Sequence, residues 1–127
     1  LGIDEFRLTY AKVDTEDGSP VRDYLNVVDL VDAHYKAFEY LTEKNASEII
    51  NLGTGKGFSV EEIIKKVEEV VGVEMPRETG ETRAGEYAAI YANYDKAKEL
   101  LDWQPQKTLD ESIRSSVKWY RSHPKGF

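Results

Sequence analysis

Two arginines stand at positions where a planar cation could bind a phosphate group. Arg22 follows a cluster of turn-forming residues at the start of an extended segment, and Arg83 lies in an irregular loop between Gly80 and Gly85. A guanidinium presents its N–H donors as a fork that matches two phosphate oxygens at once. A solvated surface arginine is the ordinary alternative, and residue type alone favours it at both positions.

Three glycines, Gly53, Gly55 and Gly57, separate an apolar segment from an amphipathic one. Glycine backbone beside a helix N-terminus can bind phosphate. Their spacing matches neither the dinucleotide fingerprint nor a Walker loop, and no acidic residue follows a second strand at the distance that ribose binding requires. We therefore interpret them as a tight turn between a strand and a helix, and assign no cofactor-binding residue.

Candidate acid–base and metal-binding residues are isolated. Tyr-x-x-x-Lys occurs at 40–44 and 94–98, each time in or beside an amphipathic helix with no dinucleotide-binding pattern before it, so no catalytic residue is assigned. His34 lies in an apolar stripe and is interpreted as a core histidine, and His123 as a surface one. Neither has partners at metal-ligand spacing, so no metal site is predicted.

The composition limits the class of protein. The chain has 127 residues, with 17 Lys and Arg against 24 Asp and Glu, a net charge of −7, which argues against nucleic acid as a partner. A hydrophobic fraction of 40% suffices for a core, and the absence of cysteine excludes disulfides and thiolate zinc sites. No apolar run approaches the ~20 residues that span a bilayer. We expect a soluble, cytoplasmic protein without a membrane partner, and, from Leu1 and a single methionine, an excerpt of a longer chain.

The elements that must position these residues follow from hydrophobic periodicity. Apolar spacing predicts helices at about 27–43, 60–71, 93–101 and 109–122, and strands at 5–10, 49–52 and 88–92. Ser59 with Glu62, and Thr108 with Glu111, form capping boxes. Gly72 ends the second helix. The first helix carries its apolar stripe at 27, 30, 31, 34, 37, 38 and 41. This predicts one compact unit of α/β class with mixed α+β character, in which helices pack with short strands.

Five ordered motifs carry a family resemblance from about residue 8 to the end. T-E-D-G-S-P-V-R-D-Y-L-N-V-V-D-L-V-D-A-H at 15–34 closely resembles the T-x-D-G-T-x-V-R-D-Y-I-H-V-x-D-L-A-x-A-H segment of UDP-glucose (UDP-galactose) 4-epimerases, which are extended short-chain dehydrogenase/reductases. Further matches follow in the family's order at 51–60, 83–86, 102–105 and 123–127.

The resemblance implies roles for three charged residues. Arg22 and Arg83 correspond to the arginines that hold the UDP diphosphate, in place of the surface interpretation above. Glu86 stands where the family has an Asp that binds the uridine ribose hydroxyls. Its extra methylene keeps the acceptor chemistry and changes the reach of the carboxylate.

Three further residues take substrate-binding roles from the resemblance. Tyr24 corresponds to the tyrosine beside the nucleotide, and Tyr10 to the uracil-stacking Phe. Ile90 falls where relatives carry a bulky Tyr or a small residue that sets the size of the sugar pocket. The intermediate volume of isoleucine is compatible with N-acetylated sugars.

The resemblance also implies the organisation of the enzyme. Residues 1–127 would form the C-terminal UDP-sugar-binding domain, and an N-terminal Rossmann domain outside this sequence would bind NAD and supply the catalytic Tyr-x-x-x-Lys. The parent would interconvert UDP-galactose and UDP-glucose in galactose metabolism through a 4-keto intermediate, as a homodimer. This chain alone would be inactive and marginally stable, because the 27–43 helix and the 49–52 strand would lack the Rossmann sheet on which they pack. Alternatives are a sugar-nucleotide dehydratase or decarboxylase, a uronate epimerase, or a non-catalytic nucleotide-sugar-binding module.

Overall fold

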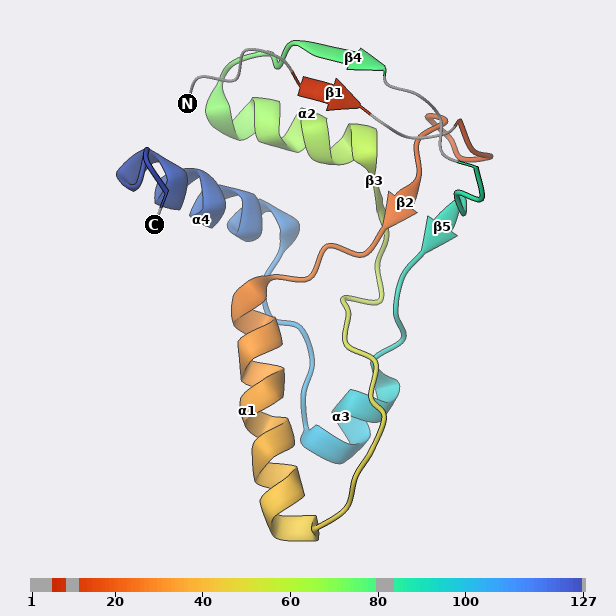
Figure 1. Cartoon of the computed structure of the whole chain (residues 1–127), viewed down its shortest axis with the longest axis vertical. Helices are drawn as coiled ribbons and strands as arrows, with labels where there is room; N and C mark the ends of the chain where they lie inside the picture. The colour runs from red at the N-terminus through yellow and green to blue at the C-terminus, as the bar shows by residue number, and fades with distance from the viewer. Residues whose placement is uncertain (1–5, 9–11, 80–83, 127) are drawn as a thin grey trace.

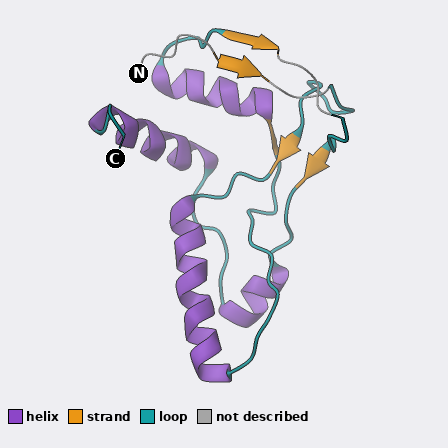
Figure 2. Ribbon diagram, in the orientation of Figure 1, coloured by secondary structure: helices purple, strands orange, loops and turns teal. Residues whose placement is uncertain are grey.

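The computed structural model describes residues 6–8, 12–79 and 84–126 (Figures 1 and 2). Helices and short strands are interspersed along the chain, which confirms the expected mixed α/β class. None of the described helices is long and apolar enough to cross a membrane. The elements are β1 (Phe6–Leu8), β2 (Val21–Arg22), α1 (Val27–Lys44), β3 (Phe58–Ser59), α2 (Val60–Val71), β4 (Arg77–Thr79), β5 (Ala89–Ile90), α3 (Asp95–Leu101) and α4 (Leu109–Ser122).

The strands form two small sheets. β1 and β4 pair in parallel, and β2 lies at the centre of a three-stranded sheet, antiparallel to β3 and parallel to β5. In this second sheet Arg22 is the register partner of Phe58 on one side and Ile90 on the other. Three segments that are distant in sequence thus meet at Arg22.

Two pairs of helices make up the rest of the molecule (Figure 1). α2 packs on α4 at the end that carries the β1–β4 sheet, and α1 packs on α3 at the other end. The first turn of α1 connects the pairs: Nδ2 of Asn26 donates to Oγ of Ser112 at 2.8 Å, and Oδ2 of Asp29 accepts from the backbone N–H groups of Gln106 and Lys107 at 3.1 and 2.9 Å.

Both predicted capping boxes are confirmed. The Glu62 N–H donates to Oγ of Ser59 at 3.0 Å, while the Ser59 N–H donates to the Glu62 carboxylate at 2.7 Å. Thr108 and Glu111 exchange the same two hydrogen bonds at 3.2 and 2.8 Å. Each exchange satisfies two backbone donors that a helix start otherwise leaves unpaired. The starts of α2 and α4 therefore follow from local sequence.

The buried core lies between α1 and α3. Ala33, Ala97, Leu101 and Trp103 form it, and Tyr94 packs edge-on against Trp103 with ring centroids 6.2 Å apart. The alanines let the two helices approach the indole closely. Burying Trp103 with its N–H hydrogen-bonded avoids the cost of an unpaired donor.

The apolar stripe of α1 is largely exposed in this chain. Val31 and Phe38 are 62% and 65% accessible, Leu30 and Ala37 are half-buried, and Asp29 and Ala33 are buried. His34, predicted to be a core residue, is also exposed, and its Nδ1 lies 2.7 Å from the Leu30 carbonyl oxygen. The small side chain of Ala33 lets α3 and Trp103 pack closely against α1. The larger side chains on the apolar side of the helix would hold them further away.

The predicted strand at 49–52 is wrong. These residues are irregular, Ile49 is 88% exposed, and Ile50 and Leu52 only flank the core. The described part of the chain places no strand beside them, and the Ile49 carbonyl accepts from Nζ of Lys96 at 2.9 Å instead. Apolar composition predicted a strand here, but a strand also needs a neighbour to pair with.

Candidate functional site around Arg22

Arg22 is held in place by backbone as well as by charge. Its Nη1 donates to the carbonyls of Val21 at 2.8 Å and Tyr87 at 3.0 Å, and its Nη2 forms an ion pair with the Glu86 carboxylate. The side chains of Arg22 and Glu86 are 27% and 20% exposed. The guanidinium is therefore oriented by the fold yet accessible to a ligand, as an anion-binding group should be.

Ile90 lies next to Arg22 across the sheet. The two residues are register partners in the parallel β2–β5 pair, and Ile90 is exposed. Glu86 and Tyr87 belong to the segment that leads into β5. The structure thus brings together three of the predicted site residues, Arg22, Glu86 and Ile90.

Asp23 fixes the backbone around this group, and sequence reasoning missed it. One carboxylate accepts the Thr54 N–H at 2.9 Å, the Thr54 hydroxyl at 2.7 Å and the Ala92 N–H at 3.2 Å. It joins the end of β2 to the 53–57 segment and to Ala92, two residues after β5. Its position beside Arg22 in the R-D-Y motif was the only signal that could have indicated it.

The glycine turn packs against the same strand. A Cβ on Gly53 would lie 2.4 Å from Oδ2 of Asp23, and one on Gly57 would lie 2.2 Å from Cγ1 of Val21. The close neighbours of these glycines are protein atoms, so their small size serves packing. The predicted strand–turn–helix arrangement is only partly present, since no strand of the described chain directly precedes these glycines and the short strand β3 separates them from α2.

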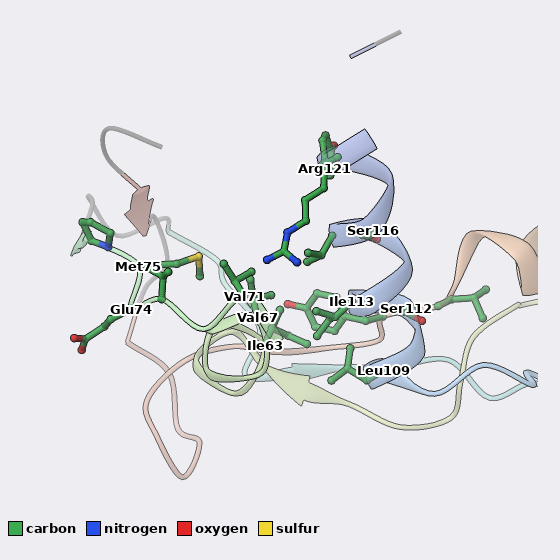
Figure 3. A pocket seen from close by; sticks show the side chains of 16 residues that line it. Ile63, Val67, Val71, Glu74, Met75, Leu109, Ser112, Ile113, Ser116 and Arg121 are labelled. Atoms are coloured by element: carbon green, nitrogen blue, oxygen red, sulfur yellow. The ribbon is translucent and has the colours of Figure 1, made fainter. Parts of the chain in front are cut away.

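Tyr24 is one of the residues that line an apolar cavity of about 730 Å³. Figure 3 shows this cavity between α2, which carries Ile63 and Val67, and α4, which carries Leu109 and Ile113. Burial raises the pKa of the Tyr24 phenol above 10.0, and the positive charge of Arg22 opposes that rise in part. The phenol is therefore neutral at physiological pH. Apolar side chains make up most of the lining, among them Ile63, Val67, Val71, Leu109, Ile113 and Val117.

The remaining candidates are Arg83, Tyr10, the tyrosines of the two Tyr-x-x-x-Lys matches, and His123. Arg83 and Tyr10 lie outside the described residues, so their roles stay predictions. Tyr40 and Tyr94 pack against the core. His123 is exposed, as predicted, and stacks on Trp119. Among the residues that the structure describes, no group of three or more His, Asp or Glu could hold a metal ion.

Comparison with known proteins gives consistent matches. The family model described as GDP-mannose 4,6 dehydratase matches residues 7–116. The UDP-glucose 4-epimerase of Lactobacillus helveticus is 38% identical over 127 residues, 99% of this chain and 38% of that protein. The enzyme of the same description from Halalkalibacterium halodurans is 41% identical over 114 residues, 89% of this chain and 34% of that protein.

A solved structure extends the match to three dimensions. The UDP-glucose 4-epimerase of Bifidobacterium longum, in complex with NAD+ and UDP, superposes with a TM-score of 0.87 at 36% identity, over 98% of this chain and 37% of that one. The chain thus spans little more than a third of the length of these relatives. Its match to the family model covers most of its own length. The chain is similar to the UDP-glucose 4-epimerases, which are extended short-chain dehydrogenase/reductases. We conclude that it belongs to the family described as GDP-mannose 4,6 dehydratase.

Proposed function

We propose that this chain supplies the UDP-sugar-binding part of an NAD-dependent UDP-glucose 4-epimerase. The observation that carries the proposal is the guanidinium of Arg22, anchored on the Val21 and Tyr87 carbonyls and partly exposed beside Ile90. The UDP in the complex of the Bifidobacterium longum relative supports the ligand class. A fixed cation suits a diphosphate, because little conformational entropy is lost on binding.

Each site residue has a distinct part in this proposal. Arg22 and Arg83 bind the diphosphate, and Glu86 accepts hydrogen bonds from the ribose hydroxyls. Tyr24 lies beside the nucleotide, Tyr10 stacks on the uracil, and Ile90 limits the size of the sugar. Such contacts orient the sugar and contribute binding energy to catalysis without touching the reacting carbon.

NAD bound by the parent enzyme would supply the hydride chemistry needed to oxidise C4 of the sugar and to reduce it again from the other face. The glycines that could have cradled a dinucleotide are packed against Val21 and Asp23. We therefore assign cofactor binding and acid–base chemistry to a Rossmann domain outside this sequence, and expect this chain alone to be inactive.

The exposed face of α1 is the surface by which we propose that the chain docks on that domain. Val27, Val31, Phe38 and Leu41 lie on one side of the helix and are 49% or more accessible. A contiguous apolar face of this kind marks an interaction surface. We also propose that the parent enzyme forms a homodimer.

Related chemistry on the same fold is the alternative. The UDP-glucuronic acid 4-epimerase of Bacillus cereus superposes with a TM-score of 0.77 at 24% identity, which shows a shared fold only. A dehydratase, a decarboxylase, a uronate epimerase and a non-catalytic nucleotide-sugar-binding module would all keep an anion-binding Arg22. Chromatography of the products formed by the parent enzyme from UDP-glucose distinguishes these activities.

Calorimetric titration of UDP into the chain tests the binding role directly. We expect Arg22→Ala to lower the affinity for UDP at least about tenfold, since a hydrogen-bonded charge pair is lost. Arg114→Ala is the matched control, because Arg114 lies on α4 and pairs with Asp110 at 2.6 Å. Equal affinity in the wild type and Arg22→Ala would overturn the assignment. The parent enzyme should then convert UDP-galactose to UDP-glucose with NAD.

A further inference from the structure

We propose that Glu86 competes with the ligand for Arg22 and so selects nucleotide diphosphates against simple inorganic anions. This inference rests on the proposed function and adds that the Glu86 carboxylate has two binding partners, one in each state of the site. In the unliganded chain Glu86 pairs with Nη2 of Arg22, and in the liganded chain it accepts hydrogen bonds from the ribose.

The geometry around Arg22 separates a fixed part from an exchangeable one. Nη1 is anchored on two backbone carbonyls, at 2.8 and 3.0 Å, which no ligand needs to displace. Nη2 is paired with a side-chain carboxylate. A carboxylate and a phosphate offer the same kind of anionic oxygen to a guanidinium, so both bind the same edge. Because Nη1 uses its two N–H groups on carbonyls, a phosphate that approaches Nη2 meets the like-charged Glu86 carboxylate there, and repulsion between the two anions favours displacement of Glu86.

The released carboxylate stays close to the ligand. Tyr87, the next residue, accepts from Nη1 of Arg22 through its backbone carbonyl, so the segment remains attached when the Glu86 side chain rotates. Both side chains are more than two-thirds buried, and water and salt therefore weaken their attraction less than at an open surface. Displacement thus carries a measurable cost.

This cost falls unequally on different anions. A ligand that binds only the open state loses affinity in proportion to the fraction of molecules in which Arg22 is free. Pyrophosphate has no hydroxyl group that could offset this loss of affinity. A uridine nucleotide offsets it, since its ribose hydroxyls donate hydrogen bonds to the displaced Glu86 carboxylate. Competition by Glu86 therefore acts as discrimination against the wrong ligand.

Calorimetry with pyrophosphate and UDP on a set of variants tests the proposal. Glu86→Gln should bind pyrophosphate about five- to tenfold more tightly than the wild type and UDP no more tightly. Glu86→Asp keeps the charge but shortens the side chain, so a gain in pyrophosphate affinity here shows that contact with Arg22, rather than charge alone, is responsible. In an Arg22→Ala background Glu86→Gln should have no effect. Glu43→Gln, at an exposed position of α1, is the control.

The outcomes separate this inference from the proposed function. Unchanged or weaker pyrophosphate binding by both Glu86 variants overturns the competition, even if the wild type binds UDP. Tighter pyrophosphate binding by the variants together with no UDP binding by the wild type supports the competition and overturns the nucleotide role. Loss of both affinities in all variants overturns both. Fluorescence of the buried Trp103 verifies that each variant is folded.

Discussion

The indole N–H of Trp103 donates to the backbone carbonyl of Asp29 at 3.0 Å, although the two residues are 74 positions apart. This buried bond joins α1 to the segment that follows α3. Trp103→Phe keeps an aromatic ring but removes the donor and part of the volume, so we expect the free energy of unfolding to fall by about 2 kcal/mol. Urea denaturation measures this change.

The second tryptophan provides the control for this substitution. Trp119 is only half-buried and stacks on His123 with ring centroids 4.8 Å apart. Trp119→Phe should change the free energy of unfolding by less than about 1 kcal/mol. Equal losses in the two variants would contradict a core centred on Trp103.

Asp23→Asn should weaken both the fold and the site. An amide cannot accept from the Thr54 N–H, the Thr54 hydroxyl and the Ala92 N–H together, because one of its two terminal groups is a donor. We expect the free energy of unfolding to fall by about 1–2 kcal/mol, and the affinity for UDP to fall as Arg22 loses its position. Thermal unfolding and calorimetry measure the two effects, with the exposed Asp14→Asn as control. Unchanged values for both would remove Asp23 from this role.

Asp17 should contribute to loss of stability in acid. Burial raises its pKa, but hydrogen bonds from Ser59 and Ser19, with the charge of Lys65, outweigh it and leave the pKa below 3.8. A carboxyl whose folded-state pKa is depressed stabilises the protein above the unfolded value and loses that contribution as pH falls through the folded value. Wild type should therefore lose stability more steeply than Asp17→Asn as pH drops below 3.8. Denaturation at a series of pH values tests this, and parallel curves would contradict it.

The exposed face of α1 should cause self-association of the isolated chain. Val31 and Phe38 present apolar surface with nothing from the described residues covering it. Val31→Gln with Phe38→Gln should shift the chain toward monomer in light scattering, while Glu43→Gln on the same helix should not. A compact, thermostable wild-type monomer would contradict the prediction.

Local signals were sufficient to predict much of the fold. The capping boxes at Ser59 and Thr108 depend on residues three positions apart, so the starts of α2 and α4 could be found from the sequence. The short strand at 89–90 followed in the same way, although it is shorter than the predicted 88–92.

Long-range contacts could not be predicted in this way. The periodicity of α1 identified its apolar side correctly, but hydrophobicity alone does not say whether that side meets this chain or another one. Asp23 and Asp29 have partners 31 to 78 positions away, and no local pattern indicates them. The motif around Arg22 predicted a cation at the site, while its pairing with Glu86 emerged only from the folded chain.

The hydrogen bonds at the first turn of α1 have a mechanical consequence. Asn26 is bonded to Ser112 of α4, and Asp29 to the backbone at 106–107, so the base of this long helix is clamped to the start of another. α1 extends away from that clamp for 18 residues (Figure 1). The orientation of α1 is therefore coupled to that of α4, because the same first turn bonds both to Ser112 and to the segment that leads into α4.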